Sequence, residues 1–129
     1  MKLTKKQCEF ILSSQFCIVA TSDKSGQPRA CIVMPEMAFD DKVIIADCQM
    51  GKTCENVKAN PKIFLSFYDD KLDFCMKCEG VAKYINDKNS SGGGQHFVAI
   101  KNKLGAEGLQ VAGIIITAVK SIYEHKENP

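Results

Sequence analysis

The stretch that decides the fold is Asp47–Pro61, which reads Asp-Cys-Gln-Met-Gly-Lys-Thr-Cys-Glu-Asn-Val-Lys-Ala-Asn-Pro. It follows an apolar, strand-like run, Val43–Ala46, and carries a Gly51-Lys52-Thr53 triplet where a short helix is expected to begin. A glycine lets the backbone approach a ligand closely, and the first helical turn offers free N–H groups and the positive end of a dipole. Because lysine adds a mobile positive charge and threonine a hydroxyl, the pattern predicts that Lys52 and Thr53 hold a phosphate group.

The triplet by itself is a weak signal for phosphate. It is not a P-loop, because the first glycine of the G-x-x-x-x-G-K-T pattern would occupy position 46, where the chain has Ala46. The alternative is an ordinary helix start with a lysine in solvent. The flanking sequence favours the phosphate interpretation, with a short helix, Lys52–Ala59, that is expected to end at Asn60-Pro61 because proline disfavours helix in the preceding residue.

Length and composition limit the classes of protein. The chain has 129 residues, which predicts a single domain, residues 1–129, with one modest core. Its net charge of +2 lacks the strongly basic character of nucleic-acid binders, so we expect no nucleic-acid partner. No apolar run approaches the roughly 20 residues that span a bilayer, and the polar N-terminus does not resemble a secretory signal. We therefore expect a cytoplasmic protein with no membrane partner.

Seven cysteines occur in the sequence, an odd number, and several of them sit inside apolar runs. This pattern fits free thiols in a reducing cytoplasm, where cysteine acts as a small core residue. Cys75-x-x-Cys78 has metal or redox spacing, but a structural zinc needs four ligands. The pair also lies on an expected strand, where positions i and i+3 face opposite sides. The sequence therefore assigns no metal site.

Six segments read as short β-strands, and most are joined by hairpin-like turns. These strands are Phe16–Thr21, Gln27–Met34, Lys42–Ala46, Lys62–Tyr68, Phe74–Ile85 and Ala112–Glu124. The first is apolar on both faces, which predicts a buried strand. The fifth changes its apolar parity near Gly80, which predicts a bulge or bend of the kind that barrels need to turn corners.

Three helices complete the pattern. Thr4 and Gln7 predict a capping box for an N-terminal helix. The second helix is Lys52–Ala59, and apolar residues at helical spacing between positions 97 and 104 predict the third. Numerous short strands, few helices and one long bent strand together predict a mainly β fold, a small six-stranded antiparallel barrel.

The order of these pieces resembles the FMN-binding split barrels of the pyridoxamine 5′-phosphate oxidase-like family, over nearly the whole chain. Three signatures carry the resemblance. The first is an opening hairpin, Ala20–Arg29, with Asp-Lys-Ser-Gly-Gln-Pro-Arg from its turn onward. The second is the strand Arg29–Met34, and the third is the Gly-Lys-Thr triplet followed by Asn56-Val57 and Asn60-Pro61. The size and the triplet are especially similar to small stand-alone FMN-binding proteins.

The resemblance implies a split barrel that holds FMN at a homodimer interface, where the partner chain covers one side of the flavin ring. Residues that would border the isoalloxazine ring are Arg29, Ala30, Cys31, Ile32, Val33 and Met34. Two positions, Asp47 and Cys48, match residues that flank the ribityl chain. The phosphate-binding turn is matched by Gly51, Lys52 and Thr53. A dimer also has a physical basis, because one barrel of this size offers too little wall to enclose both faces of a three-ring cofactor.

The function implied is that of an FMN-dependent oxidoreductase, either a flavin reductase or an enzyme acting on an unidentified small substrate. The flavin supplies the redox chemistry in such proteins, so we assign no catalytic side chain. His96 and His125 are expected to be surface histidines. True pyridoxamine 5′-phosphate oxidases carry C-terminal basic and histidine residues that grip the substrate phosphate. After Ile116 this chain has too few such residues, which argues against that activity.

Alternatives remain open at the level of the protein and of its residues. One is a non-enzymatic FMN binder, an electron carrier or flavin store. Another is a split barrel for haem or a deazaflavin, because the family's phosphate turn often carries two adjacent basic residues and here has Lys52 alone. For haem, His96 is the candidate axial ligand. Arg29 is alternatively a solvated residue at the barrel rim, and Asp47 a cap for the following turn.

Overall fold

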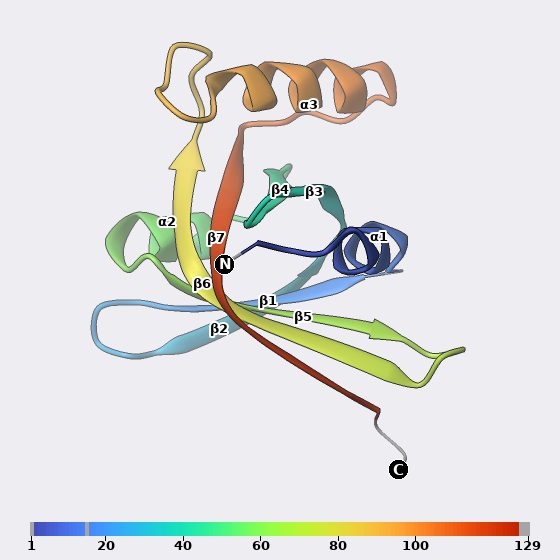
Figure 1. Cartoon of the computed structure of the whole chain (residues 1–129). Helices are drawn as coiled ribbons and strands as arrows, with labels where there is room; N and C mark the ends of the chain where they lie inside the picture. Colours follow the sequence, from blue (N-terminus) through green and yellow to red (C-terminus); the bar gives the residue numbers. More distant parts are fainter. Residues whose placement is uncertain (1, 15, 127–129) are drawn as a thin grey trace.

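A computed structural model of the chain describes residues 2–14 and 16–126 (Figure 1). Its elements alternate in a mainly β pattern that begins with a helix. In chain order they are α1 (Lys5–Ser13), β1 (Cys17–Ser22), β2 (Pro28–Val33), β3 (Pro35–Phe39), β4 (Lys42–Asp47), α2 (Lys52–Ala59), β5 (Lys62–Asp69), β6 (Phe74–Ile85), α3 (Gly94–Ala106) and β7 (Gly113–Lys126). The predicted mainly β fold with short helices is therefore confirmed.

The strands form one curled antiparallel sheet in the order β2-β1-β5-β6-β7-β4-β3. Its two end strands, β2 and β3, are consecutive in the sequence and are separated by Met34 alone. The chain therefore leaves one edge of the sheet and immediately joins the other edge. The two end strands are not hydrogen-bonded to each other, so only the chain itself joins the two edges of the sheet. The gap between β2 and β3 is the split of the barrel.

The described residues contain seven strands, so the prediction of six was wrong by one. The missing strand is β3, which the sequence analysis left between the second strand and the next turn. Pro35 has no N–H to donate, so it ends the pairing of β2 with β1. The segment after it pairs with β4 instead, with a register shift between Pro35 and Met37.

The bend predicted near Gly80 is confirmed. The register between β6 and β7 shifts between Glu79 and Gly80, as a β-bulge does. A side chain at position 80 would collide with the Ala118 carbonyl and the Thr117 methyl group, so only glycine fits there.

The predicted capping box of α1 is confirmed as well, since Thr4 and Gln7 exchange backbone and side-chain hydrogen bonds.

Two clusters of buried apolar residues stabilise the fold. The larger fills the barrel and includes Leu65 and Phe67, whereas the smaller packs α3 against β4 and β7 through residues such as Phe97 and Ile100. One expectation fails here. The first strand, β1, is not buried on both faces, because Ile18 is 39% exposed beside Ile32 of the end strand β2.

Candidate functional site

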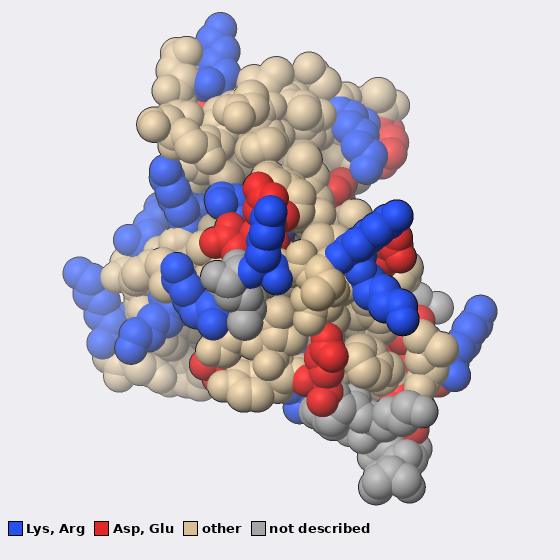
Figure 2. All heavy atoms as spheres, viewed as in Figure 1, with Lys and Arg blue, Asp and Glu red and all other residues tan. Residues whose placement is uncertain are grey.

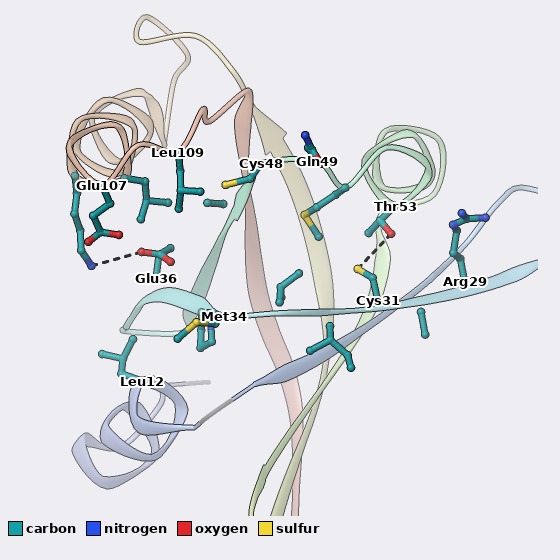
Figure 3. Close-up of a pocket in the computed structure, with 18 residues that line it drawn as sticks. Leu12, Arg29, Cys31, Met34, Glu36, Cys48, Gln49, Thr53, Glu107 and Leu109 are labelled. Carbon is teal, nitrogen blue, oxygen red and sulfur yellow. Dashed lines mark hydrogen bonds and ion pairs between the residues drawn. The ribbon is translucent and has the colours of Figure 1, made fainter.

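A cavity of about 890 Å³ lies at the split of the barrel (Figure 3). β2 forms one wall, the ends of β4 and α2 form a second, and the C-terminal end of α3 with the segment after it forms a third. The lining residues are Leu12, Arg29, Ala30, Cys31, Ile32, Val33, Met34, Pro35, Glu36, Ala46, Cys48, Gln49, Met50, Thr53, Lys103, Leu104, Glu107 and Leu109. Its volume lies within the range of small-molecule and cofactor sites.

Most of the residues predicted to bind a cofactor meet at this cavity. All six positions from Arg29 to Met34 line it, together with Cys48 and Thr53. Because β2 ends the sheet, the N–H and C=O groups on its outer edge have no neighbouring strand. The wall therefore offers main-chain donors and acceptors to a ligand as well as apolar side chains.

The three other predicted residues lie outside the lining. The carboxylate of Asp47 is bonded to Met50 and Tyr84, as described below, and Gly51 and Lys52 stand at the start of α2. Lys52 is half exposed, and its ammonium lies 3.5 Å from the Glu55 carboxylate. Its position is one residue from Thr53, which does line the cavity. The long lysine side chain can therefore swing between Glu55 and an anion at the helix start.

Two features of the sequence hold α2 in place. Gly51 has φ of 55°, a left-handed conformation that favours glycine, so the chain turns sharply into the helix. The amide groups of Asn56 and Asn60 donate to the hydroxyls of Thr21 and Ser22 on β1, at 3.2 and 3.0 Å. These bonds hold the middle and the C-terminal end of α2 against β1.

The hydroxyl of Thr53 has a weak partner within the protein. Thr53 is 1% exposed, and its oxygen lies 3.5 Å from the Cys31 thiol of β2 (Figure 3). Sulfur is a weak hydrogen-bond partner. A phosphate or hydroxyl oxygen in the cavity would therefore be a better partner for Thr53 than the one it has.

Asp47 has a structural role in this geometry. Its carboxylate accepts a hydrogen bond from the Met50 amide at 2.9 Å and one from the Tyr84 hydroxyl at 2.6 Å. Burial acts to raise the pKa of Asp47. The hydrogen bonds from Tyr84, Met50 and the Cys54 thiol, together with the positive charge of Lys58, outweigh burial and hold the pKa below its ordinary value. Burial, followed by the bond to Asp47, raises the pKa of Tyr84. Both carboxylate oxygens are thus engaged by the protein, as the turn-cap alternative predicts.

The end of the cavity near α2 is basic. Figure 2 shows lysine and arginine side chains gathered on the side where α2 and the β1–β2 hairpin lie. Exposed residues there include Lys24, Arg29, Lys52, Lys58 and Lys62. A positive field and a helix N-terminus at the same end favour an anionic group.

The opposite end of the cavity has side chains that the sequence analysis did not identify. Glu36 of β3 and Lys103 of α3 form an ion pair at 3.5 Å across it, and Glu107 lies beside them (Figure 3). Leu12 and Leu109, each about half exposed, complete this end. No motif marks these residues, because α1, β3 and α3 meet only in the folded chain.

His96 does not line the cavity. His96 lies in a separate groove, with its ring centroid 5.1 Å from that of Phe39. The side chain of His125 lies outside the described part of the structure.

Burial raises the pKa values of the Cys17, Cys54 and Cys78 thiols to about 12, so these thiols remain protonated near neutral pH.

Comparison with known proteins identifies the family. The sequence profile of pyridoxamine 5′-phosphate oxidase matches residues 3–122. The chain belongs to the pyridoxamine 5′-phosphate oxidase family. An uncharacterized protein of Methanocaldococcus jannaschii is 26% identical over 134 residues, which cover 100% of this chain and 85% of that protein.

Solved structures of this family's fold superpose closely. HupZ from Group A Streptococcus gives a TM-score of 0.79 at 22% identity, over 97% of this chain and 95% of that chain. An FMN-binding protein from Syntrophomonas wolfei gives 0.73 at 17% identity, over 94% and 84%. At these identities the similarity concerns the fold, which is the split barrel expected from the sequence.

Proteins of the same fold are described with other ligands as well. HutZ of Vibrio cholerae, described as a heme storage protein, has a TM-score of 0.67 at 15% identity, over 95% of this chain and 94% of that chain. An F420 reductase has a TM-score of 0.65 at 14% identity, over 89% and 94%. The fold alone therefore does not distinguish among flavin, deazaflavin and haem as the ligand.

Among the described residues, no helix is long and apolar enough to cross a membrane.

Proposed function

We propose that the protein binds FMN in the cavity at the split of the barrel and acts as an FMN-dependent oxidoreductase. The observation that carries the proposal is the placement of β2 and the start of α2 on two walls of one cavity of about 890 Å³. A strand edge with free main-chain groups suits the ring of a flavin. The basic end at α2 suits its phosphate.

The residues present fit the group. Thr53 and Arg29 line the basic end, and Lys52 stands within reach of it at the helix start. The main chain of β2, from Arg29 to Met34, would pair with the polar edge of the ring, and Cys48 would lie beside the ribityl chain. Bound FMN would supply electron transfer, while these residues position it and exclude water.

We propose further that two copies of the chain form a dimer across β2. Ile32 and Met34 are 69% and 64% exposed, and Ile18 of β1 extends the apolar surface. Large apolar side chains in such a group mark a contact surface. A second copy would cover this surface and give the cavity its missing wall, so that the cofactor is enclosed at the interface.

The haem alternative has less support from the geometry. Among the described residues, the lining of the cavity contains no histidine, and His96 lies in the separate groove beside Phe39. A deazaflavin with a phosphate tail would use the same basic end. A non-enzymatic carrier of FMN would use the same cavity, so only turnover of an electron donor separates a carrier from an enzyme.

The proposal is tested by titrating the protein into FMN and, separately, into riboflavin, which lacks the phosphate, with flavin fluorescence as the readout. We expect FMN to bind more tightly than riboflavin. Lys52→Ala and Arg29→Ala should each weaken FMN binding by about tenfold, the effect of one charge-assisted bond, and leave riboflavin binding nearly unchanged.

Lys71→Ala is the control, since it removes an exposed charge from the turn between β5 and β6, which neither lines the cavity nor lies at its basic end. It should alter neither affinity more than twofold. Equal binding of FMN and riboflavin to the wild type would contradict the phosphate site, and no binding of either would contradict the flavin.

A further inference from the structure

A second, smaller groove lies beside the cofactor cavity. It has a volume of about 330 Å³ and is formed by α1, β3 and α3. Its lining residues are Leu12, Glu36, Met37, Ala38, Phe39 and His96. Two of them, Leu12 and Glu36, also line the larger cavity, so the two hollows meet at a shared wall.

Glu36 stands at this shared wall because of a bulge in β3. The pairing with β4 passes from Pro35↔Ile45 to Met37↔Ile44, so Glu36 has no opposite residue. A bulge re-aims a side chain, and bulges are frequent next to active sites. Here it turns a carboxylate toward the hollow side of the sheet, where the side chain is only 14% exposed.

The carboxylate of Glu36 has capacity left for a ligand. Its one ion pair among the described residues, to Lys103, is 3.5 Å long, and the lysine side chain is 62% exposed. A pair of this length with one solvated partner is weak. An ionised carboxylate accepts about four hydrogen bonds, so Glu36 can accept N–H donors from a molecule in the groove.

The rest of the groove is an aromatic and apolar surface. The rings of Phe39 and His96 lie 5.1 Å apart, centroid to centroid, at 44°. Met37 and Leu12 add flexible apolar groups. A flat ring packs well against such a surface, because aromatic pairs favour tilted and offset contacts and methionine sulfur contacts ring edges.

We propose that this groove binds the reactant that meets the cofactor, as a flat aromatic or heteroaromatic ring without a phosphate group. Its N–H donors or positive charge face Glu36. Its ring packs against Phe39, His96 and Met37. The described lining has no cluster of basic side chains for a phosphate. The inference rests on the proposed function for the role of the bound ring, but the groove and its selectivity are tested independently of FMN.

The experiment uses three probes of one shape and different charge. Benzamidine is a cation with N–H donors, benzamide is neutral, and benzoate is an anion. Binding to the full chain is measured by NMR titration, with and without saturating FMN, and FMN affinity is measured in the same samples. We expect benzamidine to bind at least about tenfold more tightly than benzoate, with benzamide between them.

Two variants separate charge from stacking. Glu36→Gln should remove the preference for benzamidine over benzoate, and Phe39→Leu should weaken all three probes together. The matched controls are Glu107→Gln, a carboxylate that lines the larger cavity but not the groove, and Gln95→Leu, an exposed neighbour of His96 on α3. Both should retain the wild-type order of affinities.

The inference is overturned if benzamidine and benzoate bind the wild type equally, or if the preference survives in Glu36→Gln. It is also overturned if Glu107→Gln abolishes the preference instead. If FMN fails to bind while the probes bind with the expected order, the proposed function fails and the groove stands. If FMN binds and the probes do not, the groove fails and the cofactor site stands.

Discussion

β4 and β2 are both strands of six residues with mostly apolar cores, yet their surroundings are opposite. In β4, three consecutive residues, Val43, Ile44 and Ile45, are fully buried. In β2, the first three residues are exposed, and Ile32 is 69% exposed. Apolar sequence alone therefore does not tell whether a strand is covered by its own chain.

The difference follows from the place of each strand in the sheet. β4 lies between β7 and β3, and its side chains enter the barrel cluster on one face and the α3 cluster on the other. β2 ends the sheet and forms a wall of the cavity. An apolar strand that its own chain does not cover can contact a cofactor and a second copy of the chain. We interpret β2 in this way.

The largest expected effect is at β4. Ile45→Ala removes a fully buried side chain from the barrel cluster, and the packed neighbours can fill the space only in part. We expect the free energy of unfolding to fall by about 2–5 kcal/mol, as for buried isoleucines elsewhere. Urea unfolding followed by circular dichroism measures the change. A loss below about 1 kcal/mol would contradict the full burial of Ile45 in the barrel cluster.

A smaller effect is expected where β4 ends. Tyr84→Phe removes the hydrogen bond to Asp47 and leaves a buried carboxylate with one donor fewer. The expected loss is about 1–3 kcal/mol at pH 7. Phe retains the ring, so its contact with the Lys58 ammonium, 4.4 Å from the ring centroid, is kept and serves as an internal control.

The same variant has a predicted pH dependence. Because the pKa of Asp47 is held below its ordinary value in the folded protein, its contribution is present above about pH 4 and is lost as the pH falls further. The wild type and Tyr84→Phe should therefore converge in stability toward pH 3. A difference that stays constant from pH 7 to pH 3 would show that the bond to Asp47 is not its source.

The smallest effect on folding is expected at β2. Ile32→Ala should change the free energy of unfolding of the separated chain by no more than about 0.5 kcal/mol, because the side chain is mostly in solvent. Ile32→Glu places a charge on the proposed contact between copies. Sedimentation velocity should then show a dimer for the wild type and a folded monomer for Ile32→Glu. A wild-type monomer, or an Ile32→Glu dimer of unchanged affinity, would contradict the contact.

Much of the fold was predictable because it depends on local signals. The helix Lys52–Ala59 has the predicted bounds, set by Gly51 at its start and Asn60-Pro61 after its end. The bulge at Gly80 was predictable because the apolar residues change from one set of alternate positions to the other near this glycine. β3 was missed because Pro35 and the bulge at Glu36 break the alternation that marks a strand.

In the candidate site, too, the residues with a local sequence signal were predicted and those without one were missed. The β2 residues and Thr53 lie close together, as expected from segments that the family resemblance marks. The structure agrees with the alternative that Asp47 caps the following turn. Its hydrogen-bond partner Tyr84 lies 37 positions away, and nothing in the sequence pointed to it. Glu36, Lys103 and Leu109 come from elements that meet only through the closure of the sheet, so no spacing in the sequence pointed to them.

The central claim, that the split of the barrel holds a flavin anchored by the start of α2, has one direct test. The purified protein and the Lys52→Ala/Thr53→Ala double variant are each incubated with FMN, passed through gel filtration and examined by absorption spectroscopy. The account predicts flavin bands that travel with the wild type and are lost from the variant, with both proteins folded by circular dichroism. A wild type that emerges colourless, or a variant that keeps its flavin as well as the wild type does, would contradict it.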